Sequence, residues 1–151
     1  MNPFYRAALD IAERKLFVDE TPSFLLSPRL GTGGNFEDIF LWDTCFCALW
    51  AQYHLERFPL EDSLDNFYRC QMPDGFISRQ IRSDGKPKWD SHHPISFSPP
   101  LLSWVELVLS EKGLFPGRLK RVFPALLRQH RCNRERFRKA NGLYFSDQYG
   151  C

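Results

Sequence analysis

Aromatic rings stand beside carboxylates and amides at several points of the sequence, and this combination can hold a sugar. The C–H faces of a sugar stack on rings, while charged acceptors and amides bind its hydroxyl pairs. Core packing explains Phe40 and Trp42 as well as sugar binding does, and helix capping explains Asp43 equally well. A tight turn explains Asp74 better than sugar binding does. The candidates are Phe36, Phe40, Trp42, Asp43, Gln71, Asp74, Phe76, Trp89, Asp90, His92, His93 and Ser98.

The composition is typical of a folded domain with its own core. The 151 residues, of 17.8 kDa, are 43% hydrophobic and 25% charged, which excludes a disordered tail, and 15% of them are aromatic. No apolar run approaches the ~18 residues that span a bilayer. The first residues also lack the pattern of a secretory signal. We therefore expect a cytoplasmic protein without membrane contact.

The five cysteines predict neither a disulfide framework nor a metal centre. Their number is odd and they are scattered, as in a cytosolic protein with free thiols. Cys45 and Cys47 are too close in sequence for a zinc knuckle, and the four histidines form no ligand pattern with them. We expect no metal and no other cofactor.

Residues 118–139 are strongly basic, with nine Lys and Arg residues against the single acid Glu135. Such a stretch is either a phosphate-binding face or the solvated outer face of an amphipathic helix, whose long stems cover apolar surface. The second interpretation is favoured, because the apolar residues between the charges are spaced for packing. No nucleic-acid motif accompanies the stretch, so we expect no nucleic-acid partner.

The elements that position the candidates are predicted to be helices joined by loops that Pro and Gly mark. Helices are expected over residues 3–18, 40–55, 59–70 and 99–113, with one piece over 116–122 and another from Pro124, which does not fit inside a continuous helix without cost. A turn is expected over 71–76, a short hairpin near 83–85, and a turn into an extended run over 141–145. No period-two alternation persists, so the predicted fold class is all-α.

Two properties of these elements bear on the site. The helix over 40–55 is apolar nearly all round, which predicts burial on most of its sides. The loops over 19–38 and 71–98 are long and alternate with short links. If the helices run up and down, the long loops share one end of the molecule, and the site is expected there.

Four short motifs follow one another along the chain. Residues 40–46 (FLWDTCF) are similar to a "flWDtaf" motif, and residues 71–77 (QMPDGFI) to a "Q-x-PdGfip" turn. Residues 98–102 (SPPLL) are similar to "(T/S)QPPLLa", and residues 141–145 (NGLYF) to "dGLyyw". In this order the sequence resembles glycoside hydrolase family 63, in the form of the bacterial mannosylglycerate and glucosylglycerate hydrolases. Trehalases are similar at a greater distance.

The resemblance implies an (α/α)₆ barrel, of which residues 1–151 would be the N-terminal part of one catalytic domain, with about five to six of the helices. It implies inverting hydrolysis of an α-glycosidic bond in a small glycoside, by two carboxylates about 6.5–9.5 Å apart. The general acid is expected just beyond Cys151 and the general base in the remaining half of the barrel, so no catalytic residue is assigned in this chain. The substrate-binding residues that it implies are Phe36, Trp42, Asp43, Gln71, Phe76 and Ser98.

The expected partners are a small carbohydrate and the remaining half of the barrel, and the chain alone is expected to be inactive and to expose apolar surface. Ser98 stands where the family has Gln. Two alternatives stay open: a trehalase-like hydrolase, and a non-enzymatic helical module whose basic 118–139 face meets an acidic partner.

Overall fold

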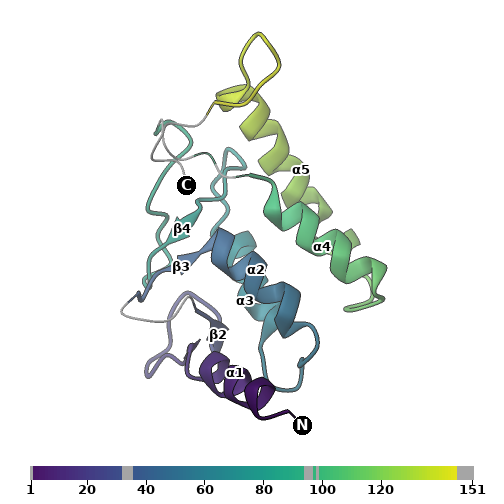
Figure 1. Cartoon of the computed structure of the whole chain (residues 1–151). Coiled ribbons are helices and arrows are strands. Elements are labelled where there is room, and N and C mark those ends of the chain that lie inside the picture. The colour runs from purple at the N-terminus through teal and green to yellow at the C-terminus, as the bar shows by residue number, and fades with distance from the viewer. Residues whose placement is uncertain (1, 32–35, 94–96, 98, 146–151) are drawn as a thin grey trace.

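The described residues of the computed structural model (2–31, 36–93, 97 and 99–145) form five helices and four short strands (Figure 1). No helix in this part of the chain is long and apolar enough to cross a membrane. In chain order the elements are α1 (Pro3–Glu13), β1 (Leu16–Phe17), β2 (Arg29–Leu30), β3 (Ile39–Phe40), α2 (Leu41–Ala51), α3 (Leu60–Arg69), β4 (Gln80–Ile81), α4 (Leu101–Glu111) and α5 (Arg118–Phe137).

Helix α2 lies at the centre of the packing, because it contacts both α3 and α4, while α4 also packs on α5. Its Leu41, Cys45 and Ala48 are fully buried, and they recur at the spacing that places residues on one side of a helix. Leu64 of α3 and Leu102 of α4 are buried in the same core. The core therefore covers one side of α2, and the opposite side of the helix lies outside the core.

The expectation of an all-α chain is correct only in part, because the helices are accompanied by two small antiparallel sheets. Strand β1 pairs with β2, and β3 pairs with β4. Each strand has two residues, which is too short for a period-two alternation to show in the sequence. The first sheet also explains why α1 ends at Glu13 and not near residue 18: Leu16 and Phe17 pair with Leu30 and Arg29.

Most other predicted elements agree with the structure within a few residues. Helices α3 and α4 match the predicted helices over 59–70 and 99–113, and α2 ends earlier than predicted, at Ala51. The turn over 71–76 is confirmed: the Met72 N–H donates to the Phe76 carbonyl at 2.8 Å, and Gly75 has a φ of 91°. Gly75 suits this position because its φ is unfavourable for residues with a Cβ.

Helix α5 is continuous through Pro124, so the prediction of two separate helical pieces is wrong. Proline removes one hydrogen bond to the carbonyl four residues earlier, here that of Lys120. Both Pro124 and Lys120 are exposed. Water can therefore hydrate the Lys120 carbonyl, and the helix tolerates proline at this position.

A buried ion pair joins α4 to α5. The Arg118 guanidinium, 4% exposed, donates to both carboxylate oxygens of Glu106 at 2.8 and 2.9 Å, and Glu106 is 1% exposed. Tyr68 of α3 donates to the same carboxylate at 2.9 Å, and burial beside Glu106 raises the pKa of this phenol above its ordinary value. Arg118 also donates to Asp65 of α3 at 2.7 Å. The pair thus connects three helices.

This cluster corrects the interpretation of the basic stretch as a solvated face. Arg118 is buried, and Arg121 forms ion pairs with Glu61 at 2.8 Å and Asp65 at 2.9 Å. Two of the nine basic residues therefore hold α5 against α3. The interpretation as a solvated face holds for the exposed basic residues of the stretch, which include Arg131, Arg134, Arg136, Arg138 and Lys139.

Replacing Glu106 by alanine should strongly destabilise the protein. The change leaves the Arg118 guanidinium buried without its main partner, and breaking such a pair costs about 3–5 kcal/mol. Urea unfolding measures the loss. The control is Glu111→Ala, at an exposed position of the same helix, which should change stability by less than about 0.5 kcal/mol. Equal effects of the two substitutions would contradict this role of the pair.

Candidate functional site

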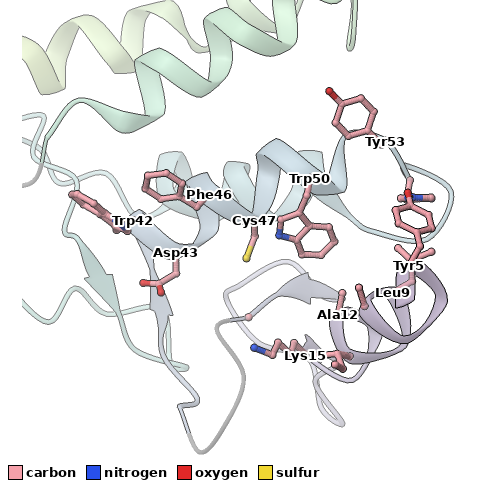
Figure 2. Close-up of a pocket in the computed structure, with 14 residues that line it drawn as sticks. Tyr5, Leu9, Ala12, Lys15, Trp42, Asp43, Phe46, Cys47, Trp50 and Tyr53 are labelled. Atoms are coloured by element: carbon pink, nitrogen blue, oxygen red, sulfur yellow. The ribbon is translucent and has the colours of Figure 1, made fainter. Parts of the chain in front are cut away.

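A hollow of about 650 Å³ lies between α1 and α2 (Figure 2). Residues of α1 form one wall, and the side of α2 that faces away from the core forms the other. Two of the residues predicted from the sequence to bind a substrate line the hollow, Trp42 and Asp43.

The α2 wall is a row of aromatic side chains. Trp42, Phe46 and Trp50 recur every four residues of α2, so they lie on one side of the helix, and Tyr53 follows just after its end. Each is at least 36% exposed, and the rings of Trp42 and Phe46 are 5.5 Å apart. The prediction that this helix is buried on most sides is therefore wrong. A sequence that is apolar all round does not tell which side the core covers.

Asp43 lies in the first turn of α2, next to Trp42, and its carboxylate projects into the region between α2 and α1 (Figure 2). The side chain is exposed. The position near free helix N–H groups favours a carboxylate, as the capping interpretation holds. The same exposure leaves its oxygens open to hydroxyl donors. Trp42 and Asp43 together thus offer a stacking surface and a hydrogen-bond acceptor at neighbouring positions of α2.

The α1 wall is held mainly by polar contacts at its two ends. The Tyr5 hydroxyl hydrogen-bonds to Nε2 of His54, and Arg57 Nε donates to Glu13 at 2.6 Å. Within α1, all of which the structure describes, Leu9 alone is buried. Sequence reasoning missed the part that α1 plays in the hollow. Its apolar stripe shows that it packs, but carries no information on which helix it meets.

Gln71 and Phe76, two further predicted binding residues, lie away from this hollow. The Gln71 amide donates to the carbonyls of Gly75 and Ala125, both at 2.8 Å, so it ties the turn to α5. Phe76 is 1% exposed and packs against Phe137 and Cys132. In this structure both side chains hold the turn over 71–76 in place.

The last two predicted binding residues are placed differently. Phe36 is 61% exposed, and its ring lies edge-on against that of Phe40, 5.6 Å away. It precedes β3 and does not line the hollow. Ser98 lies outside the described residues. The structure therefore brings Trp42 and Asp43 together in one hollow and places Phe36, Gln71 and Phe76 outside its lining.

Asp74 has the turn role that the sequence favoured. The Phe76 N–H donates to it at 3.0 Å, and the Ser91 hydroxyl donates to its other oxygen. Partial burial opposes ionisation, but the hydrogen bonds from Ser91 and Phe76 outweigh it and hold the pKa of Asp74 below its ordinary value.

Comparisons with known proteins establish the fold of the chain. No family model and no curated protein matches the sequence. Among solved structures, an uncharacterized conserved protein from Thermus thermophilus matches 89% of this chain with a TM-score of 0.61 and 24% sequence identity. The chain spans 32% of the length of that protein. At this identity the likeness concerns the fold.

Replacing Asp74 by asparagine should make the protein less stable at neutral pH and no less stable in strong acid. A carboxyl with a lowered pKa stabilises the folded state above its unfolded pKa of about 3.9, and this stabilisation is lost as pH falls through the folded value. Thermal unfolding between pH 2 and 7 measures the difference from the natural protein. Asp62→Asn, on the exposed side of α3, is the control. A difference that persisted undiminished at pH 2 would refute the ionic contribution.

Proposed function

We propose that this chain is the sugar-binding part of an inverting glycoside hydrolase that cleaves an α-glycosidic bond in a small glycoside such as glucosylglycerate or mannosylglycerate. The observation that carries the proposal is the presence of both Trp42 and Asp43 in the lining of an aromatic hollow. In this role the sugar ring stacks on the Trp42 indole, and Asp43 accepts hydrogen bonds from its hydroxyls. Sequence motifs at these two positions, in order with three others, support the same assignment.

The catalytic carboxylates belong, in this proposal, to a longer chain that completes an (α/α)₆ barrel. The fold match covers about a third of a longer protein, which supports a larger fold. An exposed apolar surface on α4 supports it too, because Trp104 is 42% and Leu107 is 49% exposed. We infer that the remaining helices cover this surface, and that these 151 residues alone bind sugar without hydrolysing it.

A trehalase-like specificity is the alternative within the same reaction class, and comparing trehalose with glucosylglycerate as ligands separates the two. The module with a basic face is less well supported, since Arg118 and Arg121 already bind the acidic residues of α3 and α4. A cytoplasmic location is also part of the proposal, and its support is that Cys45, Cys47, Cys70 and Cys132 are all unpaired.

Titration calorimetry of this chain with glucosylglycerate tests the proposal. Trp42→Ala removes the stacking surface and Asp43→Asn the charged acceptor, and each should weaken binding about tenfold, the effect of losing roughly 1.4 kcal/mol. Both side chains are exposed, so both variants should stay folded, and Asp43→Asn should cost no more than about 1 kcal/mol for the lost charge in the first turn of α2.

The matched control is Phe123→Ala on α5, which removes a 56% exposed ring far from the hollow and should leave binding unchanged. If Trp42→Ala and Asp43→Asn bound the glycoside as tightly as the natural chain, or if the natural chain bound none, the proposal would fail.

A further inference from the structure

The short hairpin that follows α5 presents an Asn–Gly pair at its tip. Of the five asparagines of the sequence, Asn141 alone is followed by glycine, and its side chain is exposed. The Lys139 N–H donates to the Leu143 carbonyl at 2.8 Å, and the Phe145 N–H donates to the Phe137 carbonyl at 2.8 Å. These bonds hold the two arms of the hairpin together. The proposed sugar site uses neither residue of the Asn–Gly pair.

An asparagine before a glycine can lose ammonia without an enzyme. The backbone nitrogen of the glycine attacks the side-chain carbon Cγ, and a five-membered succinimide ring forms as the bond from Cγ to the amide nitrogen breaks. The amide group leaves as ammonia with the proton that the attacking nitrogen gives up. Water then opens the ring at either carbonyl, which produces aspartate or isoaspartate. Glycine favours the first step because it has no Cβ to hinder the approach of its nitrogen.

The side chain of Asn141 is held where this attack takes place. Its Oδ1 accepts a hydrogen bond from the Leu143 N–H at 3.0 Å, in the turn by which an asparagine side chain binds the backbone two residues further on. This bond folds Cγ back beside the peptide group of Gly142. It also draws electron density toward Oδ1, which makes Cγ a better target for the nitrogen.

A cation lies beside the attacking group. The Nε of Arg138 is 3.5 Å from the Gly142 carbonyl oxygen, and its Nη2 is 3.6 Å from the position that a Cβ on Gly142 would have. Nearby positive charge favours the deprotonated backbone nitrogen, which is the form that attacks. It favours the carboxylate of the product in the same way. Arg138 therefore assists both the reaction and its outcome.

One hydrogen bond opposes the reaction. The Gly142 N–H donates to the Lys139 carbonyl at 2.9 Å and must leave it before the nitrogen can attack. Lys139 is exposed and Gly142 is half-buried, so water can take the place of this bond. The net contribution of such a bond is small, because the broken state is hydrogen-bonded to water. The bond slows the reaction without preventing it.

We propose that Asn141 is a site of spontaneous deamidation in the folded chain. Either product adds a negative charge next to the basic 118–139 stretch. Aspartate keeps the length of the backbone, and the hairpin with it. Isoaspartate adds a methylene group to the backbone at the tip, which disturbs the pairing of Lys139 with Leu143 and loosens the stacking of Tyr144 on Phe97, whose rings are 5.5 Å apart.

Incubation of the full chain in mildly alkaline buffer, followed by mass mapping of its peptides, tests the site. The peptide with Asn141 should gain about one dalton, the change from an amide to a carboxyl group. The peptides with Asn66 and Asn133, which are buried and precede larger residues, should keep their mass. Asn141→Gln should keep its mass as well, because its ring closure needs six members.

Arg138→Gln should slow the reaction about threefold, the range of one exposed charge interaction. The matched control is Arg134→Gln, at an exposed position one turn earlier, which should react at the natural rate. A mass gain that appears only after unfolding in urea, or that reaches Asn66 and Asn133 as fast as Asn141, would overturn the proposal. Equal rates in Arg138→Gln and the natural chain would refute the part assigned to Arg138. Trp42→Ala should react at the natural rate, so the result is independent of the glycosidase proposal.

Discussion

The buried pair of Arg118 and Glu106 is the interaction on which the arrangement of the helices depends. A guanidinium and a carboxylate that are both removed from water must meet each other, since either one alone would be strongly unfavourable. Because Asp65 and Tyr68 bind the same pair, α3, α4 and α5 are held in one relative position. Helix α2 packs on α3 and α4, so the pair also sets which side of α2 is left uncovered.

That uncovered side carries the candidate site. Burial of Leu41, Cys45 and Ala48 turns the opposite row of rings outward, and α1 then closes a hollow against it. The hollow beside α1 is lined by aromatic rings and by the carboxylate-bearing residue Asp43. Its lining therefore suits a ligand with an apolar face that stacks on a ring and with hydroxyls that donate to a carboxylate.

Helices and turns could be predicted from the sequence where one residue decides the local conformation. Pro59 and Gly113 mark ends of α3 and α4, and Gly75 supplies the positive φ of its turn. Long-range effects could not be predicted in this way. The two-residue strands depend on partners distant in sequence. Pro124 is tolerated because its side of α5 faces water. The Gln71 amide donates to the carbonyl of Ala125, which is distant in sequence. Trp42 and Asp43 can be recognised in the sequence because an aromatic ring stands beside a carboxylate. The α1 wall of the hollow can be recognised only from the tertiary structure.

The most direct test of the central claim is the indole N–H spectrum of the four tryptophans during titration with glucosylglycerate. Trp42 lines the hollow at its Asp43 end, and Trp89 lies on the 77–98 segment, outside it. We expect a saturable shift of the Trp42 signal while the Trp89 signal stays in place. A Trp42 signal that does not move, or four signals that drift together, would contradict it.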